Sequence, residues 1–267
     1  MTAPRILGIV NVTEDSFSDG GRYLDPERAI AHAMALAADG ADAIDLGGAA
    51  SNPGAAPVEP EVEQRRLAPV VAHLRRHGVA VSVDSFHPAT QRWALAEGVA
   101  FVNDTRGFPD PSIYAALAAS AVRLVVMHAV QPTGKADRTT LADPATIYDR
   151  VEAFFAARLA ALESAGIARE RCIVDPGMGL FLGGTAPSIA ILRRLGDLRR
   201  RFGLPVLVSV SRKSILRDLT GRAAGERGPS TLAAELFAAR QGVDWLRTHD
   251  VRALRDALAV TAALGDR

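Results

Sequence analysis

The chain of 267 residues alternates short segments rich in Val, Ile and Leu with longer segments of helical period, and this alternation most limits its fold. The predicted strands are Arg5–Val10, Ala41–Leu46, Val79–Val83, Val99–Val102, Val122–Met127, Arg171–Val174, Pro205–Val210 and Val243–Leu246. Strands that alternate strictly with helices indicate a parallel sheet. Eight such units in about 260 residues fit a (β/α)8 TIM barrel better than an open sheet.

The segments between the strands carry helix start and stop signals. Asp25 suits an N-cap, Pro26 suits the first helical position, and Gly40 lies where that helix should stop. The predicted helices are Pro26–Ala38, Pro60–His77, Pro88–Glu97, Asp110–Ser120, Pro144–Ala165, Ala186–Phe202, Pro229–Gln241 and Val251–Leu264. No proline- or serine-rich linker interrupts the series, so we expect a single barrel domain over residues 1–267.

The composition favours a globular protein with a sizeable core over several other classes of protein. Hydrophobic residues make up 48% of the chain, which is enough for a sizeable core. The net charge of +1 and the aromatic content of 5% argue against a nucleic-acid or membrane partner. No apolar run of 18 residues and no signal-like start is present, so we expect a cytoplasmic protein. The single cysteine, Cys172, is predicted to be a buried, inert thiol.

Each predicted strand ends in polar residues or glycines. These endings are Asn11, Gly47-Gly48, Asp84, Asn103-Asp104, His128, Asp175, Ser211-Arg212-Lys213 and Arg247-Thr248-His249. In a barrel, the carboxyl ends of all strands face one mouth, where active sites form. A single ending of this kind is explained by a cap or a turn, but eight together predict a binding site.

The first chemical set among these endings consists of Asp84, Asn103 and Asp175. Their carboxylates and amide suit a planar heterocycle with several N–H donors and a carbonyl, such as a pterin or a purine. Met127 is expected to pack as an apolar wall of that pocket. The neighbouring His128 is expected to be a structural histidine with its hydrogen bonds satisfied.

The second set consists of Asn11, Lys213, Arg247 and His249, which supply cationic and amide groups. The loops after the seventh and eighth strands are the common phosphate site of a barrel. Arg247 and His249 are two residues apart on a strand, so they should point to the same side. Ser214 should begin a short helix, Ser214–Leu219, whose first N–H groups suit an anion.

Eight motifs along the chain resemble, in order, those of the dihydropteroate synthase family. They are GIVNVTEDSFSDGG (Gly8–Gly21), DLGGAASNPGA (Asp45–Ala55), SVDSF (Ser82–Phe86), NDTRGF (Asn103–Phe108), VVMH (Val125–His128), DPGMG (Asp175–Gly179), VSRKS (Val210–Ser214) and RTHDV (Arg247–Val251). The resemblance implies a transferase of folate biosynthesis. Such an enzyme joins 6-hydroxymethyl-7,8-dihydropterin pyrophosphate to p-aminobenzoate, releases pyrophosphate and uses Mg²⁺.

The resemblance also implies roles for individual residues. The pterin would be held by Asp84, Asn103, Asp175 and Lys213, and the Mg²⁺–pyrophosphate by Asn11, Arg247 and His249, with Asn11 as the metal ligand. The catalytic residues would be Lys213, Arg247 and His249. Ser51 and Ser214 would lie near p-aminobenzoate. The resemblance further favours a homodimer, in which Ala-rich helical surfaces such as Ala233–Ala239 could pack against a second copy.

The segments RGFPDP (Arg106–Pro111), PGMGLFLG (Pro176–Gly183) and Ser51-Asn52-Pro53 resemble the sulfonamide-resistant, mobile-element-borne versions of the family. The chain also departs from the usual family pattern at three places. Glu14 replaces a proline, Ser51-Asn52 replaces Thr-Arg, and the loop after DPGMG carries Leu180-Phe181-Leu182-Gly183. We therefore hypothesise sulfonamide insensitivity: Phe181 would leave room for flat p-aminobenzoate and collide with a bent sulfonyl group. The sequence does not predict how the loops Thr13–Gly21, interpreted as a lid, and Ala49–Ala55 close.

Two alternatives stay open at the level of sequence. A pterin- or folate-binding methyltransferase barrel would share the fold and the pterin carboxylates, but it would not require the anion set around Lys213, Arg247 and His249. A non-catalytic relative would bind a pterin or another protein without turnover, because a fold and its motifs do not guarantee activity.

Overall fold

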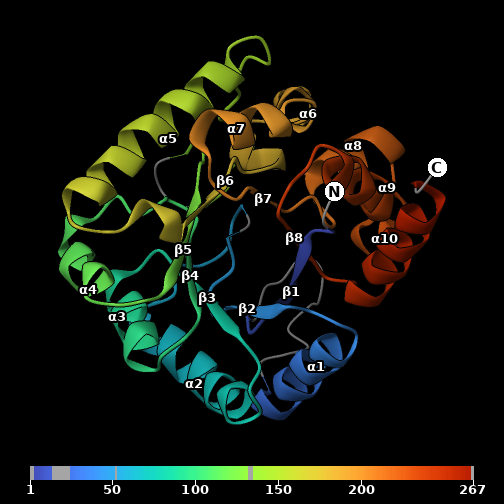
Figure 1. The fold of residues 1–267 in the computed structure, drawn as a ribbon. Coiled ribbons are helices and arrows are strands. Elements are labelled where there is room, and N and C mark those ends of the chain that lie inside the picture. The colour runs from blue at the N-terminus through green and yellow to red at the C-terminus, as the bar shows by residue number, and fades with distance from the viewer. Residues whose placement is uncertain (1–2, 14–24, 52, 132–134, 266–267) are drawn as a thin grey trace.

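The computed structural model describes residues 3–13, 25–51, 53–131 and 135–265 and contains an eight-stranded parallel sheet. The strands are β1 (Arg5–Asn11), β2 (Ala43–Gly47), β3 (Val81–Asp84), β4 (Phe101–Asp104), β5 (Arg123–Met127), β6 (Cys172–Asp175), β7 (Leu207–Val208) and β8 (Trp245–Thr248). Their order is β6-β5-β4-β3-β2-β1-β8-β7. A parallel bridge between Val174 and Val206 joins the two edges, so the predicted barrel is confirmed (Figure 1).

Helices surround the barrel on the outside (Figure 1). They are α1 (Pro26–Ala38), α2 (Pro60–Arg76), α3 (Pro88–Ala96), α4 (Tyr114–Ala118), α5 (Ile147–Ser164), α6 (Thr185–Leu192), α7 (Leu195–Phe202), α8 (Ser214–Thr220), α9 (Gly228–Arg240) and α10 (Val251–Gly265). The start of α1 follows the prediction, because the Asp25 side chain accepts a hydrogen bond from the Glu27 N–H and Pro26 opens the helix. Among these described helices, none is long and apolar enough to cross a membrane.

Several predicted element boundaries were wrong. The continuous helix Ala186–Phe202 divides into α6 and α7 because Arg194 leaves helical geometry, with φ −123° and ψ 17°. Its guanidinium lies 3.4 Å from the centre of the Tyr148 ring and pairs with Asp197. The predicted loop after β6 contains a 3-10 turn, Gly179–Leu182. The helix predicted at Asp110–Ser120 is a 3-10 turn, Pro111–Ile113, followed by the short α4.

The interior of the barrel is filled in layers. Its lower layer is a buried apolar cluster of Leu7, Ala43, Phe101, Val125, Ile173, Leu207 and Trp245. Phe101 and Trp245 meet edge to face, with ring centroids 5.3 Å apart. Because side chains on a strand repeat their direction every two residues, the next inward layer contains Asp45, Asn103, Met127, Asp175, Ser209 and Arg247. The lower layer therefore closes the barrel, and the polar layer forms the floor of its mouth.

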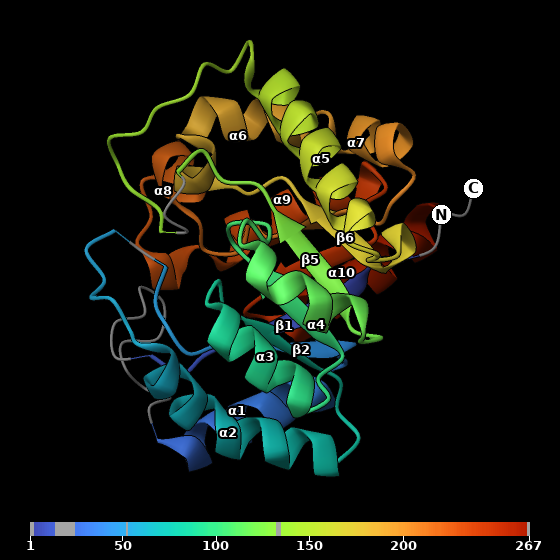
Figure 2. The same ribbon diagram turned by 90° about the vertical axis from the view of Figure 1, so that its left-hand side faces the viewer.

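The long connections after β2 and β5 lie on one side of the barrel, and the first and last described residues lie on the other (Figure 2). The carboxyl ends of the strands are on the loop side. Cys172, at the start of β6, is a buried free thiol whose pKa is raised to about 11 by desolvation. It is therefore unreactive at neutral pH, as the sequence predicts.

Gly107 shapes the loop that follows β4, and its replacement tests the packing of that loop. Its φ is +66°, and a Cβ atom there would lie 2.7 Å from Phe154 Cζ and 2.8 Å from the Met127 carbonyl oxygen. We expect Gly107→Ala to lower the free energy of unfolding by about 2–4 kcal/mol, because left-handed strain and overpacking add. Equilibrium denaturation measures the change.

The matched control is Gly225→Ala. No atom lies within 4 Å of a Cβ built at Gly225, and its φ is not in the left-handed region. This variant should stay within about 0.5 kcal/mol of the wild type. Equal stabilities for the two variants would contradict the proposed packing.

Candidate active site

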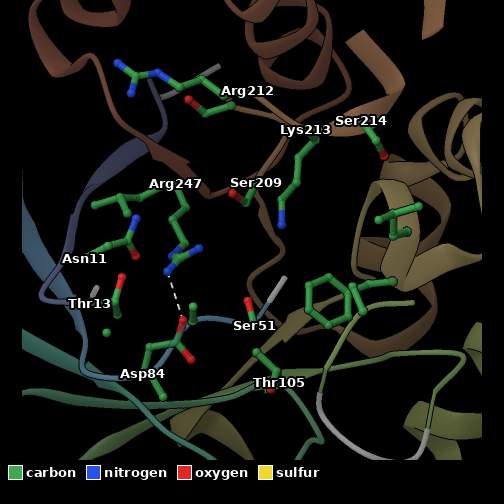
Figure 3. A pocket seen from close by; sticks show the side chains of 18 of the residues that line it. Asn11, Thr13, Ser51, Asp84, Thr105, Ser209, Arg212, Lys213, Ser214 and Arg247 are labelled. Atoms are coloured by element: carbon green, nitrogen blue, oxygen red, sulfur yellow. Dashed lines mark hydrogen bonds and ion pairs between the residues drawn. The ribbon is translucent and has the colours of Figure 1, made fainter. Parts of the chain in front are cut away.

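A cavity of about 240 Å³ opens at the carboxyl ends of the strands, and side chains from distant parts of the chain line it. In Figure 3, the side chains of Asn11, Asp84, Lys213 and Arg247 point toward its centre. Eight of the predicted site residues line the cavity: Asn11, Ser51, Asp84, Phe181, Lys213, Ser214, Arg247 and His249. The predicted mouth is therefore the place where these residues meet.

Asn103, Met127 and Asp175 are not among the lining residues. They are 3%, 6% and 4% exposed and belong to the buried layer at the floor. The Asp175 Oδ1 accepts a hydrogen bond of 2.8 Å from the Gly177 N–H. Met127 packs with Phe181 and Ala136, which do line the cavity. These three predicted residues thus support the lining rather than form it.

Arg247 is the centre of an ion-pair network across the floor. Its Nη2 lies 2.9 Å from Asp84 Oδ2, and its Nε donates to Asp45 Oδ2. The Asp45 side chain is completely buried. The Asn103 amide also approaches Asp45 Oδ2, at 3.4 Å. One cation from β8 therefore pairs with two carboxylates from β2 and β3, and these contacts fix the position of its side chain.

Asp45 was missed by the sequence reasoning. It lies within β2 (AIDLG) rather than at the strand end, where polar residues were sought. A lone carboxylate inside an otherwise apolar strand was the available signal, because such a group is rarely buried without a partner. Glu63 of α2 was also missed. It lines the cavity, and its carboxylate accepts hydrogen bonds of 2.7 Å from the hydroxyls of Ser85 and Thr90.

Several acceptors at the floor have no partner among the residues that the structure describes. Asp45 Oδ1 and Asn103 Oδ1 are buried and form no hydrogen bond there. The hydroxyl of Ser209, which lines the cavity, is also buried and forms no hydrogen bond there. Buried polar atoms in native proteins are normally paired. Unpaired acceptors below a cavity therefore indicate a ligand that brings N–H donors.

Burial shifts the proton equilibria of the charged groups toward neutral pH. Desolvation raises the pKa of Asp84 to about 7, against the attraction of Arg247. It raises the pKa of Asp175 to about 6, against the hydrogen bond from Gly177. Desolvation, with repulsion from Arg247, lowers the pKa of Lys213 to about 8. Small changes in local charge can therefore alter the protonation of the floor.

His249 lines the cavity with Arg247, so the prediction that the two point to the same side is confirmed. The role of His249 in the anion set stays a prediction. Desolvation, together with Arg212 and Arg247, lowers the pKa of its imidazole well below the usual value. The ring is neutral at pH 7, and its Nδ1 lies 2.9 Å from Ser211 Oγ. A neutral imidazole can act as a hydrogen-bond donor or acceptor.

His128 is structural, as expected. It is 1% exposed, its Nδ1 lies 3.2 Å from the Pro176 carbonyl oxygen, and desolvation lowers its pKa to about 4. A Cβ atom at Gly177 would lie 2.4 Å from the His128 carbonyl oxygen. The Asp-Pro-Gly turn therefore packs directly on the end of β5, and only glycine fits there.

The other end of the cavity is formed by three loops that are tied together. Phe181 is 4% exposed, and its ring centroid lies 5.1 Å from Lys213 Nζ. The Val130 N–H donates to the Phe181 carbonyl at 2.9 Å, and the Ala136 N–H donates to the Ser51 carbonyl at 3.0 Å. The loop after β5 therefore holds the loops after β2 and β6. Ser214 opens α8 beside them, as predicted.

The predicted lid, Thr13–Gly21, lies outside the described residues except for Thr13, and Asn52 also lies outside them.

Oxygen donors for a metal ion lie at the end of β1. The Asn11 side chain points into the cavity, and the Thr13 hydroxyl is buried without a partner among the described residues (Figure 3). Within the same residues, no group of three or more His, Cys, Asp or Glu side chains could hold a metal. One or two hard oxygen donors fit Mg²⁺, which usually keeps waters and takes further oxygens from a bound phosphate.

Comparison with known proteins identifies the family. Residues 7–249 match the profile described as pterin binding enzyme. A dihydropteroate synthase type-2 of Escherichia coli is 59% identical over 261 residues, which cover 97% of this chain and 95% of the relative. The chain belongs to the dihydropteroate synthases. A dihydropteroate synthase type-3 of Escherichia coli is 48% identical over 262 residues, which cover 98% of this chain and 99% of the relative.

Solved dihydropteroate synthases have the same fold. The Yersinia pestis enzyme, in complex with a sulfonamide drug, superposes with a TM-score of 0.92 at 32% identity, covering 99% of this chain and 95% of that one. The Xanthomonas albilineans enzyme in complex with 7,8-dihydropteroate gives a TM-score of 0.84 at 35% identity, covering 99% and 94%. The family predicted from the motifs is therefore confirmed, together with its barrel fold.

The variant Arg247→Gln tests the ion-pair network. It leaves Asp45 buried without a counter-charge, so we expect the free energy of unfolding at pH 8 to fall by about 3 kcal/mol. Loss of the cation raises the pKa of Asp84 further above its unfolded value. The stability contributed by a protonated Asp84 is fully present below its unfolded pKa. It is lost as pH rises through about 7 in the wild type and through a higher pH in the variant. The deficit should therefore be smaller at pH 5 than at pH 8.

Arg252→Gln is the matched control, because Arg252 pairs with Asp39 at the surface with 75% of its side chain exposed. Its effect should be below about 1 kcal/mol. Denaturant titrations at the two pH values measure both variants. If Arg247→Gln loses no more free energy of unfolding than the control, or if the loss does not depend on pH, the described pairing of Arg247 with Asp45 and Asp84 is contradicted.

Proposed function

We propose that the enzyme condenses 6-hydroxymethyl-7,8-dihydropterin pyrophosphate with p-aminobenzoate to give 7,8-dihydropteroate and pyrophosphate. One observation carries the proposal: a single cavity has hydrogen-bond acceptors at its floor and cationic donors on the wall formed by the segments after β7 and β8. A pterin fits the first part and a diphosphate the second. The names of the relatives, and the 7,8-dihydropteroate bound by the Xanthomonas enzyme, support this assignment.

In this proposal the pterin lies over the floor. Asp84, Asn103 and Asp175 accept hydrogen bonds from its ring nitrogens and amino group, and Lys213 donates to its carbonyl oxygen. The unpaired oxygens of Asp45 and Asn103 support the placement, because they need donors. Met127 packs under the ring from its buried position. Entry of the ring requires Asn103 and Asp175 to become accessible through a small shift of the lining.

The diphosphate then reaches Asn11, Arg247 and His249. Arg247 donates to Asp45 and Asp84 through two nitrogens, and a guanidinium has five N–H donors, so others remain for phosphate oxygens. The neutral His249 adds one more donor. Asn11 and Thr13 would hold Mg²⁺ by their side-chain oxygens. When bound, Mg²⁺ supplies neutralisation of the negative charge on the leaving pyrophosphate.

The reaction we propose is dissociative. The bond between the pterin methylene carbon and the diphosphate oxygen breaks first, and both electrons leave with pyrophosphate, toward Arg247 and His249. The positive charge on the methylene group is stabilised by the carboxylates of Asp84 and Asp175. The neutral arylamine nitrogen then bonds to the methylene carbon and gives up one proton to solvent. No general base is required, because an arylamine is already nucleophilic.

The second substrate is proposed to lie near Ser51, Phe181 and Ser214. Phe181 is held by the loop after β5, and its ring faces the Lys213 ammonium. A flat p-aminobenzoate fits beside such a ring, whereas a tetrahedral sulfonyl group carries its substituent toward it. We therefore propose that the enzyme is the sulfonamide-insensitive form expected from its motifs.

The proposal includes a homodimer and a cytoplasmic location. Phe237 of α9 and Val260 and Leu264 of α10 are large hydrophobic residues with 40%, 59% and 76% of their surface exposed. The two helices pack against each other, so these residues offer one apolar face to a second copy. This apolar face supports the proposed second copy of the chain. The proposed small-molecule substrates rest on the family instead.

One assay separates this function from its alternatives. The purified enzyme is incubated with the pterin pyrophosphate, p-aminobenzoate and Mg²⁺, and released pyrophosphate is measured. We expect release only with all three present, and a loss of about 100-fold or more in kcat/KM for Arg247→Gln, with Arg252→Gln unaffected. Pterin binding without release would support a non-catalytic relative. Methyl transfer from a folate to a corrinoid would support the methyltransferase reading.

Phe181→Ala tests the origin of sulfonamide insensitivity. Removal of the ring should lower the inhibition constant of a sulfonamide about tenfold or more, because a pocket that rejects a ligand by steric contact relaxes when the contact is removed. The KM for p-aminobenzoate should change by a smaller factor. Steady-state inhibition series measure both constants.

Leu180→Ala is the control, since Leu180 is the neighbour of Phe181 and also lines the cavity. It should leave the inhibition constant within about threefold of the wild type. The hypothesis is wrong if a sulfonamide already competes with the wild type as tightly as p-aminobenzoate and Phe181→Ala changes nothing.

A further inference from the structure

Arg212, in the turn between β7 and α8, has a backbone conformation that non-glycine residues avoid. Its φ is +56°, and among the residues that the structure describes only Phe108 is also a non-glycine residue with positive φ. This left-handed conformation brings Cβ too close to the following carbonyl oxygen, so it persists only where surrounding contacts impose it. The next residue is Lys213, whose side chain points into the cavity (Figure 3).

Both peptide groups that flank Arg212 are held by residues at the start of α9. The Arg212 N–H donates to the Thr231 hydroxyl at 3.2 Å, and the Arg212 carbonyl oxygen accepts from Nη1 of Arg227 at 2.8 Å. The first contact orients the peptide group before Arg212, and the second orients the peptide group after it. Because φ and ψ are the only soft rotations between two peptide groups, the two contacts together specify the left-handed state.

The side chain of Arg227 is itself fixed. It is 9% exposed, and its Nε donates to the Arg222 carbonyl oxygen at 2.9 Å, so the guanidinium joins two backbone segments. The Arg227 carbonyl oxygen accepts from the Thr231 N–H at 2.7 Å, which places the two holding groups one helical turn apart. A planar guanidinium with several donors suits two carbonyls at once, whereas an ammonium is a single point of contact.

The residues after Arg212 have little freedom to compensate for a change in the turn. The Lys213 N–H donates to the Val210 carbonyl oxygen at 3.1 Å. A Cβ atom at Gly179 would lie 2.9 Å from Ser214 Oγ, so the loop after β6 packs closely on the first residue of α8. A right-handed Arg212 would turn the chain in another direction and move Lys213 away from the cavity.

We propose that Arg227 is a positioning residue: with Thr231, it holds Arg212 in the left-handed conformation, and this turn directs Lys213 into the cavity. Arg227 also lines the cavity, but its role in this proposal is exerted through the backbone of Arg212. The kinetic effect rests on the proposed function, in which Lys213 contacts the pterin. The held conformation is a property of the enzyme alone.

Phe108 provides a matched comparison, because its backbone is held in the same way. Its φ is +59°, its N–H donates to Asp104 Oδ2 at 3.1 Å, and its carbonyl oxygen accepts from Nη1 of Arg158 at 2.5 Å. Neither Phe108 nor Arg158 is among the residues that line the cavity. Arg158 therefore has the same backbone role as Arg227, without a proposed substrate group beside it.

A double-variant comparison tests the proposal. Arg227→Met removes the donor to Arg212, so the KM for the pterin pyrophosphate should rise about tenfold as the turn relaxes and Lys213 is misplaced. Glycine adopts the left-handed conformation without steric cost. In an Arg212→Gly background, Arg227→Met should therefore raise KM less than about threefold relative to Arg212→Gly alone. Thr231→Val, which removes the other contact, should be suppressed by Arg212→Gly in the same way.

Arg158→Met is the control for a purely structural effect. It should lower the midpoint of denaturation, as Arg227→Met does, but leave KM within about twofold of the wild type. Equal fold-changes for Arg227→Met in the two backgrounds would overturn the proposal, because lost charge or lost stability is not relieved by changing Arg212. If Arg227→Met does not fold, the same comparison with Thr231→Val decides.

Crystal structures of the variants test the conformation without substrates. Arg227→Met should show Arg212 with a negative φ and a displaced Lys213 side chain, and adding Arg212→Gly should restore the wild-type turn. A left-handed Arg212 with Lys213 unmoved in Arg227→Met would overturn the proposal. Because these structures need no turnover, a failure of the proposed reaction would appear in the pyrophosphate assay and not in them.

Discussion

The guanidinium of Arg247 bridges carboxylates from two other strands, and the floor of the cavity depends on that bridge. Asp45 is completely buried and pairs with the Nε of Arg247, and a buried charge is costly when it has no partner. Asp84 is shared between the floor and the cavity. The bridge links β8 to β2 and β3 at the mouth, where the apolar packing of the lower barrel has ended. Charge pairing therefore replaces hydrophobic contact as the force that shapes this level of the barrel.

Inward-facing side chains repeat every two residues along each strand, and one layer of them stabilises the barrel while the next forms the floor of the site. Ala43, Phe101, Ile173 and Trp245 fill the lower barrel, and the residues two positions later are Asp45, Asn103, Asp175 and Arg247. The apolar layer gives the strands a closed, dry base. The polar layer is thereby held at a fixed height with its acceptors directed upward. The same layer that costs desolvation energy is the one that can recognise a heterocycle.

The fold could be predicted from the sequence because each strand and helix has a strong local signal. The site residues at strand ends could be predicted for the same reason, since chain order and the geometry of a barrel bring them to one mouth. Asp45 could not, because its role depends on Arg247, a residue about 200 positions away whose side chain direction is set by packing. The break between α6 and α7 lies where Arg194 contacts Tyr148, and long-range contacts of this kind leave no periodic trace in the sequence. The neutral state of His249 likewise results from burial near Arg212 and Arg247, not from its neighbours in sequence.

The loop after β5 donates a backbone hydrogen bond to the carbonyl of Phe181 and another to that of Ser51. In the proposed function, selectivity for the arylamine is therefore a shared property of three loops, because a backbone contact from Val130 helps to hold the Phe181 ring. A substitution near Val130, which does not line the cavity, can move the ring while every residue in the pocket stays the same. Surveillance of drug susceptibility that compares only pocket residues among related enzymes would overlook such changes.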